Sequence, residues 1–246
     1  MRDAFSRTAL LIGAEGLERL ARARVAVFGL GGVGGWAAEA LARSGVGALD
    51  LVDDDRIAPS NVNRQIFALT STVGQYKADA ARARILDINP EAQVRAVKVF
   101  FGVQNAGEFD FSQYDYVVDS IDTVTRKIQL IQQAQAVGTP IISSMGTGNK
   151  LDPTMLQVAD IYETSVCPLA RIMRKELRRR GVKALKVVYS REEPIVPCGE
   201  VPQEDEPERD GAPSRRATPG SCSFVPPAAG LIIAGEVVRD LIGISR

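Results

Sequence analysis

The glycine-rich segment between Gly29 and Gly34 constrains the fold of this chain more than any other feature of its 246 residues. Its G-x-G-x-x-G spacing follows the branched, apolar run Arg24–Gly29 and precedes the helix-favouring run Trp36–Arg43. Glycines between a strand and a helix let backbone amides approach a phosphate, and the positive end of the helix dipole favours the negative charge. The segment therefore predicts a phosphate-binding loop, with a purely structural turn as the alternative.

Strands and helices alternate after this loop. A second apolar run, Ala48–Asp53, completes a β-α-β unit whose crossover is expected to be right-handed. The alternation predicts an α/β fold with a doubly wound, Rossmann-like, mostly parallel sheet. The further elements expected in it are helices at Lys77–Asn89 and Lys127–Val137, and strands at Val94–Phe100, Tyr116–Asp119 and Ile141–Met145.

The pattern changes after about residue 160, which predicts three parts. The first is a core over residues 1–160. The second, over residues 161–223, is a basic segment followed by a flexible, proline-rich excursion. The third, over residues 224–246, carries a helix from about Ala228 that packs back on the core.

The composition narrows the possible chemistry. The chain has no His, which removes the commonest general base and every Ser-His or Cys-His pair. Its three cysteines, Cys167, Cys198 and Cys222, form no C-x-x-C pair, so neither a disulfide framework nor a four-thiolate zinc site is indicated, and inert or structural thiols are expected. Catalysis must then depend on carboxylates, Lys, Arg, backbone amides or a cofactor.

The charge and hydropathy patterns indicate a cytoplasmic protein without a membrane partner. No apolar signal segment follows Met1, and the most apolar late stretch, residues 228–244, is shorter than a bilayer span and contains charged side chains. Thirty basic residues balance thirty acidic ones. Because the whole chain has no net field that attracts polyanions, binding of nucleic acid would need a local basic patch.

The charged residues around the glycine loop favour ATP over a redox cofactor. Asp53 ends the second strand, where a carboxylate can accept hydrogen bonds from ribose, and this feature fits a nicotinamide dehydrogenase equally well. Phosphoryl chemistry also needs cations and a metal held by a carboxylate, which hydride transfer does not. We therefore expect Arg64 and Lys77 to clamp phosphates and Asp122 to bind Mg²⁺ at the end of a strand.

These assignments have simpler alternatives. Arg64 and Lys77 would be ordinary surface charges in the alternative interpretation. Asp122 would be a helix N-cap ahead of Thr123, and Asp55 would cap the turn that follows it.

The combined spacing of these residues resembles the ThiF/MoeB/ubiquitin-activating superfamily, whose members adenylate carboxylates with MgATP. The resemblance implies that residues 1–160 form an ATP-binding adenylation core and that the protein is a homodimer. Catalytic roles are implied for Arg64, Lys77, Asp122 and Arg7, the last acting across the dimer interface. Nucleotide-binding roles are implied for Gly29, Gly31, Gly32, Gly34, Asp53, Asp55, Asn61, Arg64, Gln65, Lys77 and Asp122.

Further strings resemble a tRNA-modifying branch of this superfamily: Phe5–Gly13, Ile88–Pro90, Asp119–Thr125, Gly148–Pro153 and Lys186–Ser190. This branch implies that the carboxylate of threonylcarbamoyladenosine, in ANN-decoding tRNAs, is adenylated and then closes into a ring with loss of AMP. It also implies a cysteine desulfurase or sulfur-acceptor partner. ThiF and MoeB adenylate the C-terminus of a sulfur-carrier or ubiquitin-like protein, which is the alternative, but their C-x-x-C pairs are missing here.

A run of cations between residues 171 and 186 matches the need for a tRNA-binding surface. Glu176 is the one acidic residue in this run. Phosphate contacts dominate the affinity for nucleic acids, although a solvated amphipathic helix face is the alternative. At helical spacing, Arg171, Arg174, Lys175 and Arg178 are expected on one face. The predicted tRNA-binding residues are Arg171, Arg174, Lys175, Arg178, Arg179 and Arg180.

Overall fold

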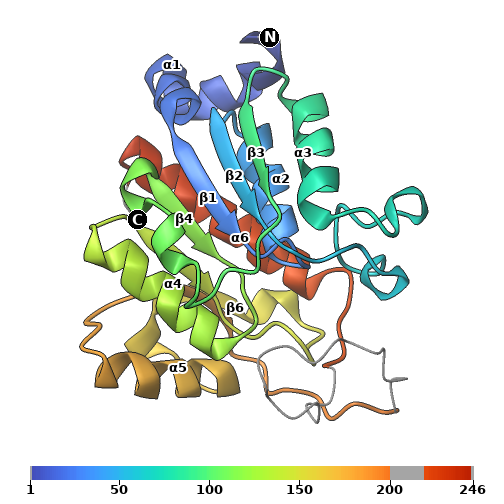
Figure 1. The fold of residues 1–246 in the computed structure, drawn as a ribbon, viewed down its shortest axis with the longest axis vertical. Coiled ribbons are helices and arrows are strands. Elements are labelled where there is room, and N and C mark those ends of the chain that lie inside the picture. Colours follow the sequence, from blue (N-terminus) through green and yellow to red (C-terminus); the bar gives the residue numbers. More distant parts are fainter. Residues whose placement is uncertain (1, 200–218, 245–246) are drawn as a thin grey trace.

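The fold is a single seven-stranded sheet covered by helices (Figure 1). The computed structural model describes residues 2–199 and 219–244. The strands occur in the order β3-β2-β1-β4-β5-β7-β6, and all of them run parallel except β6, which is antiparallel to β7. Their bounds are Arg24–Phe28 (β1), Ala48–Val52 (β2), Gln93–Val97 (β3), Tyr116–Asp119 (β4), Ile141–Ser144 (β5), Leu156–Asp160 (β6) and Lys186–Ser190 (β7).

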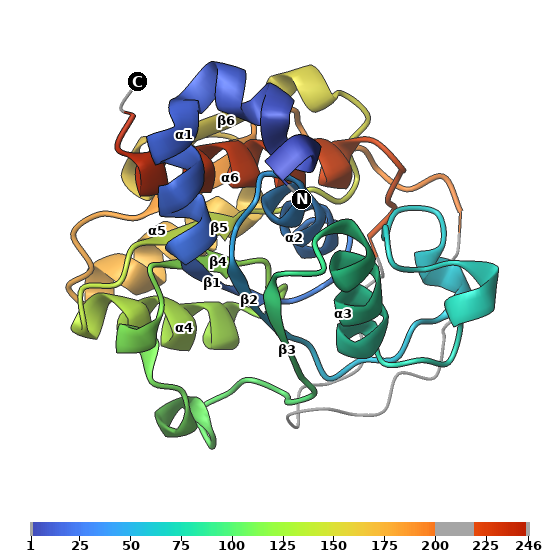
Figure 2. The same ribbon diagram turned by 90° about the horizontal axis from the view of Figure 1, so that it is seen from above.

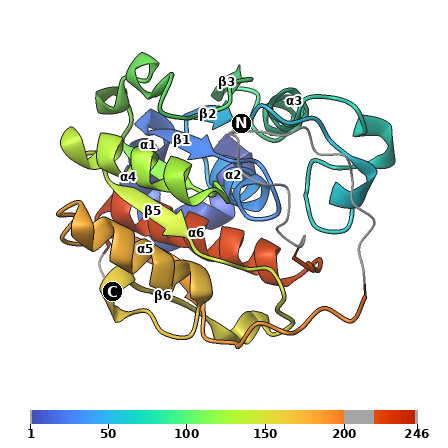
Figure 3. The same cartoon turned by 60° about the horizontal axis from the view of Figure 1, so that its bottom comes forward.

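Helices cover both faces of the sheet (Figure 2). One face carries α1, α2, α3 and α6, and the other carries α4 and α5, which lie side by side (Figure 3). None of the described helices combines the length and the apolarity that a membrane span requires. The bounds are Ser6–Arg22 (α1), Gly34–Arg43 (α2), Lys77–Ile88 (α3), Val124–Ala136 (α4), Pro168–Arg179 (α5) and Val225–Ile242 (α6).

The two faces of the sheet enclose two apolar cores. In β1, Val25 and Val27 belong to the core under α1, α2, α3 and α6, whereas Ala26 and Phe28 belong to the core under α4 and α5. Successive side chains of a strand point to opposite faces, so a parallel strand covered on both sides is apolar along its whole length. Burial on both faces explains the uninterrupted apolar run before the glycine loop.

The expected α/β class with a doubly wound sheet is confirmed, whereas several element ends differ from the prediction. The helix expected from Lys127 begins at Val124, one turn earlier. The helix expected from about Ala228 begins at Val225 and has prolines in its first turn. Proline is tolerated there because first-turn amides make no hydrogen bond within the helix.

The sheet also includes residues that the sequence analysis placed outside the core. Strand β7 lies between β5 and β6, and α5 packs beneath it, so the core continues to Ser190. Although α5 is rich in cations, it has one buried apolar face, formed by Ala170, Met173 and Leu177 at helical spacing. Residues 200–218 of the expected proline-rich excursion lie outside the described part of the chain.

Helix α6 packs against the start of α2, the helix that follows the glycine loop. A side chain at Gly230 would place its Cβ 2.3 Å from the carbonyl oxygen of Val33 and 2.9 Å from Cβ of Trp36. Only a glycine therefore permits this close crossing of α6 over α2. The crossing also places Pro226, in the first turn of α6, beside Gly32.

Candidate nucleotide-binding site

The glycine loop occupies the point where the sheet's connections diverge. From β1 the chain continues to β2 and β3 on one side, and it later returns to β4 on the other side. Ligands of open α/β sheets bind at such a point, outside the carboxyl ends of the strands. Gly29 follows β1 with a φ of 86°, and its amide donates to the carbonyl of Val52 at 2.9 Å. The loop is thus joined to the end of β2.

The glycines of the loop have different physical roles. A Cβ at Gly34 would lie 1.9 Å from the carbonyl oxygen of Gly29, and one at Gly29 would lie 2.7 Å from that of Ser120. These two glycines permit close packing of backbone on backbone. Around Gly31 the nearest atom would be Nε2 of Gln65 at 3.9 Å, so the loop is open here. The backbone around Gly31 is where a phosphate could approach closely.

Asp53 organises the acidic side of the loop. Its carboxylate accepts hydrogen bonds from the amides of Leu30 at 2.6 Å and Asp55 at 2.9 Å. Burial raises the pKa of Asp53 above its ordinary value, although the positive charge of Lys77 opposes this shift. The carboxylates of Asp53, Asp54 and Asp55 come within 4.8 Å of one another, so these three residues could together hold a metal ion.

The raised pKa predicts how Asp53 affects stability. A carboxyl group whose folded pKa lies above its unfolded value, here 3.8, stabilises the fold fully at lower pH. That stabilisation is lost as the pH rises through the folded pKa. The free energy of unfolding of the wild type, minus that of Asp53→Asn, should therefore fall as the pH rises from below 3.8 towards neutrality. Urea unfolding of both proteins measures this difference, and a rise instead would contradict the assignment.

Lys77 is buried beside this acidic group. Its side chain is only 8% exposed, and its Nζ lies 2.8 Å from Oδ2 of Asp55. The lysine begins α3, and its amide also donates to the carbonyl of Asp55 at 2.9 Å. The alternative of an ordinary solvated lysine is wrong, because burying an ammonium group requires a specific partner.

Arg64 lies against the glycine loop on the other side. A Cβ at Gly32 would meet Cγ of Arg64 at 3.3 Å. The guanidinium donates to the carbonyl of Ser60 at 2.9 Å and to Oδ1 of Asn63 at 3.0 Å, and the backbone carbonyl of Arg64 accepts from Nε1 of Trp36. The arginine is therefore half-buried and held, not a freely solvated charge.

The buried neighbours Asn61 and Gln65 shape the turn that carries Arg64. The side-chain oxygen of Asn61 accepts from the amide of Ala58 at 3.1 Å, and its carbonyl accepts from the amide of Gln65 at 2.9 Å. Both side chains are more than nine-tenths buried. Asn61 thus holds the turn in shape, while the amide group of Gln65 faces Gly31.

Asp122 is exposed in the connection from β4 to α4. Its Oδ1 accepts from the hydroxyl of Thr123 at 3.1 Å. The alternative role as a helix cap is wrong, because the N-cap of α4 is Thr123. Asp122 is not a member of the acidic group formed by Asp53–Asp55. It follows β4, so it lies at the carboxyl edge of the sheet together with the end of β1.

Arg7 lies in the first turn of α1 and is exposed. Within the described residues, no hydrogen bond or ion pair connects it to the glycine loop. Its neighbours on α1, Leu10 and Leu11, are 86% and 85% exposed.

Three residues beside the loop were not predicted as functional. The hydroxyl oxygen of Ser120 is buried and has no hydrogen-bond partner among the described residues, although Ser120 lies against Gly29 and Gly34. Asp119 and Lys127 form an ion pair of 2.9 Å, with both side chains fully buried. The spacing from Asp119 to Lys127 was visible in the sequence, but the burial that makes this pair informative was not.

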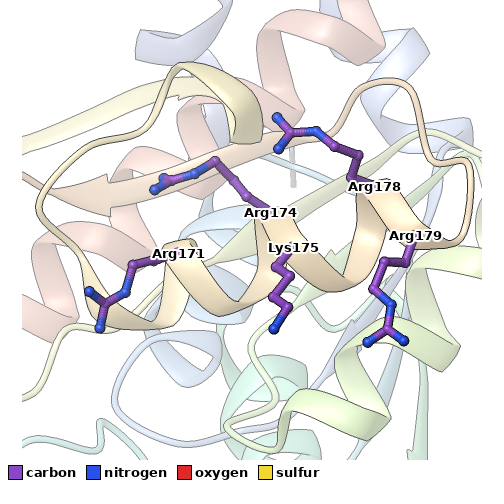
Figure 4. Close-up of a pocket in the computed structure, with 5 residues that line it drawn as sticks. All are labelled: Arg171, Arg174, Lys175, Arg178 and Arg179. Carbon is purple, nitrogen blue, oxygen red and sulfur yellow. The ribbon is translucent and has the colours of Figure 1, made fainter.

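Five of the six predicted tRNA-binding cations, all except Arg180, line a surface groove of about 430 Å³ on α5 (Figure 4). These five cations line the same groove, within which the side chains of Arg174 and Arg178 point to one side and those of Arg171, Lys175 and Arg179 to the other. Figure 4 therefore shows two rows of cations on one helix.

The cations of this groove differ in how they are held. Arg174 donates to the carbonyl of Thr164 at 2.8 Å, and the guanidinium of Arg178 lies 5.0 Å from the ring centre of Tyr162. Arg179 and Arg180 are paired with Glu176. Arg171 and Lys175 are exposed and have no ion-pair partner within residues 2–199 and 219–244.

A glycine turn at the switch point of a doubly wound sheet, flanked by two held cations and an acidic group, defines a nucleotide-binding protein of the Rossmann-like class. Comparison with known families identifies the family within this class. The chain belongs to the ThiF family, whose model matches residues 5–246.

Relatives of known name align over nearly the whole chain. The tRNA threonylcarbamoyladenosine dehydratase of Bacillus subtilis is 48% identical over 239 residues, which cover 97% of this chain and 94% of the relative. Crystal structures of the Escherichia coli tRNA N6-threonylcarbamoyladenosine dehydratase, TcdA, in complex with ATP and with AMP superpose with TM-scores of 0.86 and 0.87. Each is 33% identical and matches 98% of this chain and 95% of its own.

Proposed function

We propose that the protein is an ATP-dependent enzyme that modifies tRNA, by adenylating the carboxylate of threonylcarbamoyladenosine and dehydrating the nucleoside to a cyclic form. The observation that carries this proposal is the match over 97% of the chain to a dehydratase of that name, together with the likeness to its ATP and AMP complexes. The geometry around the glycine loop supports the nucleotide-binding part of this proposal, because backbone open to a phosphate lies close to the cations Arg64 and Lys77.

The nucleotide would be held by groups that the loop already presents. The backbone around Gly31 is open to a phosphate, and the remaining lone pairs of the Asp53 carboxylate suit ribose hydroxyls. The hydroxyl of Ser120, which has no hydrogen-bond partner among the described residues, would gain one in the bound nucleotide. Arg64 and Lys77, from the turn and helix after β2, would then face the phosphates from two sides.

The first chemical step joins the substrate carboxylate to AMP. A carboxylate oxygen attacks the α-phosphorus, the bond from that phosphorus to the bridging oxygen breaks, and pyrophosphate departs. A carboxylate is already ionised at neutral pH, so this step needs no strong base, which suits a chain without His. Arg64 and Lys77 would stabilise the charge that develops on the phosphates.

Asp122 is the residue we assign to magnesium. An exposed carboxylate at the carboxyl edge of the sheet is an oxygen ligand of the kind that Mg²⁺ prefers, and its hydrogen bond with the Thr123 hydroxyl leaves further lone pairs available. The bound ion would supply charge neutralisation for the phosphate oxygens.

The second step closes the ring within the activated side chain. A nucleophilic atom of the same side chain attacks the acyl carbon, and the bond between that carbon and the AMP oxygen breaks. Both groups belong to one molecule, which gives the attack a high effective concentration. The overall change is the loss of one water from the nucleoside, with ATP converted to AMP and pyrophosphate.

The groove on α5 is the surface we assign to tRNA. Arg171 and Lys175 have no ion-pair partner among the described residues, whereas Glu176 offsets the charge of Arg179 and Arg180. Because phosphate contacts dominate affinity, Arg171 and Lys175 should contribute more to tRNA binding.

Reversal of these charges tests the assignment. Arg171→Glu/Lys175→Glu should weaken tRNA binding about tenfold and make the logarithmic salt dependence shallower by about two. Filter binding between low and moderate salt measures both quantities. Arg82→Glu is the control, since Arg82 is an exposed cation on α3, which packs on the edge strand β3. Equal effects of the two reversals would remove the groove from the tRNA-binding surface.

We also propose that the protein acts as a homodimer in the cytoplasm. The exposed pair Leu10 and Leu11 supports an interface on α1, since such apolar surface is normally covered. This arrangement would let Arg7 of one copy reach the site of the other. A cysteine desulfurase or sulfur-acceptor partner stays a prediction from the family resemblance alone.

Exchange of radiolabelled pyrophosphate into ATP tests the adenylation directly. Exchange that depends on tRNA containing threonylcarbamoyladenosine is the expected result. Exchange that depends instead on a carrier protein ending in Gly-Gly would favour the sulfur-carrier activity of other family members. A change in nicotinamide absorbance without exchange would replace both with redox chemistry.

A further inference from the structure

A fully buried ion pair lies directly behind the connection that carries Asp122. Nζ of Lys127 is 2.9 Å from Oδ2 of Asp119, and neither side chain has any exposed surface. The hydroxyl of Ser143, on the neighbouring strand β5, donates to the same carboxylate at 2.5 Å. Desolvating two charges costs more than an apolar pair of similar volume, so a buried ion pair is a weak way to gain stability.

The pair also holds both polar backbone groups of Ile121. The amide of Ile121 donates to Oδ1 of Asp119 at 3.1 Å, and its carbonyl accepts from Nζ of Lys127 at 3.0 Å. Ile121 directly precedes Asp122. The position of the Asp122 backbone is therefore determined by these two charged side chains.

The same connection forms one wall of the glycine turn. The amide of Ser120 donates to the carbonyl of Phe28 at 2.9 Å, and a Cβ at Gly29 would meet the Ser120 carbonyl oxygen at 2.7 Å. A shift of this connection would move Ser120 and Asp122 together relative to the loop.

Helix stability does not account for Lys127. This lysine lies in the first turn of α4, where the helix dipole disfavours a positive charge. Its contacts with Asp119 and Ile121 are thus what offsets both the dipole and the loss of hydration.

We propose that Asp119, Lys127 and Ser143 are positioning residues, which hold the Ser120–Asp122 connection in the place that adenylyl transfer requires. This inference rests on the proposed function, since it assigns the cluster a task in that reaction. It predicts that replacing the cluster with apolar side chains preserves the fold and lowers the rate of adenylate formation.

The test uses a triple variant, Asp119→Leu/Lys127→Met/Ser143→Ala, because apolar groups of similar size commonly leave stability unchanged or higher. Thermal unfolding should match the wild type. The single-turnover rate of adenylate formation should fall about 100-fold, as expected for a displaced catalytic group. Hydrogen exchange of the Ile121 amide should rise, while that of β1 and β2 should not.

Arg24→Met is the matched control, since Arg24 pairs at 3.0 Å with the fully buried Asp50 but lies at the opposite end of β1 from the loop. It should lower stability and leave both the rate and Ile121 exchange unchanged. If the triple variant keeps the wild-type rate, or loses rate without faster Ile121 exchange, the inference is overturned.

The exchange measurement separates this inference from the proposed function. A wild-type protein that binds ATP without adenylating tRNA would remove the proposed function. Bound ATP should then still slow exchange at Ile121 in the wild type and not in the triple variant. The absence of that difference would overturn the positioning role by itself.

Discussion

Replacing Arg64 with Ala should lower the rate of adenylate formation about 1000-fold, the loss typical of a guanidinium that stabilises charge in phosphoryl transfer. The reason lies in its position, because Arg64 packs against Gly32 while its guanidinium is held by the carbonyl of Ser60 and by Asn63. A cation held in advance needs no reorganisation as negative charge develops on the phosphates. Single-turnover kinetics at saturating ATP measures the loss.

Two further variants show whether the charge or its geometry matters. Arg64→Lys keeps the positive charge but loses the planar fork of donors, so it should recover only part of the rate. Arg22→Ala is the control, because Arg22 is exposed on α1 and pairs with Glu18, one turn earlier on the same helix. Wild-type turnover in Arg64→Ala, with an intact fold, would exclude Arg64 from the site.

Gly34→Ala should destabilise the protein by about 3 kcal/mol and abolish ATP binding. The added Cβ would lie 1.9 Å from the carbonyl oxygen of Gly29, which is backbone and cannot rotate away. The loop and the start of α2 would have to separate, and the amides that face the phosphate would lose their alignment. Urea unfolding and calorimetric titration with ATP measure the two effects.

Gly107→Ala is the matched control for this substitution. A Cβ at Gly107 would meet nothing within 4 Å, and the residue does not need a positive φ. The control should therefore keep both stability and ATP binding. Wild-type affinity for ATP in a folded Gly34→Ala protein would show that the nucleotide does not use this loop.

The fold could be predicted from the sequence because its main determinants are local. The glycine spacing and the apolar run before it indicate the β-α-β unit without further information, and the covered sheet explains why that run is continuous. The position of β7 could not be predicted in this way. The pairing of Val188 with both Ser144 and Val158 depends on contacts between residues far apart in the chain.

The sequence predicts residue types for the site, but it does not predict their environment. The sequence indicated that Lys77 and Asp122 belong near the loop, yet only the structure shows that Lys77 is buried and Asp122 exposed. The Asp119–Lys127 pair illustrates the same limit, because nothing local distinguishes a buried lysine in a helix from a solvated one. Hydrogen bonds to the backbone of Ile121 reveal its connection to the site.

The central claim is that the glycine loop transfers an adenylyl group to a tRNA nucleoside. Its most direct test is mass spectrometry of nucleosides from threonylcarbamoyladenosine-containing tRNA, after incubation with the purified protein, Mg²⁺ and ATP. We predict that the nucleoside loses one water and that one AMP forms for each nucleoside converted. Unchanged nucleoside, or water loss that proceeds equally without ATP, would contradict the claim.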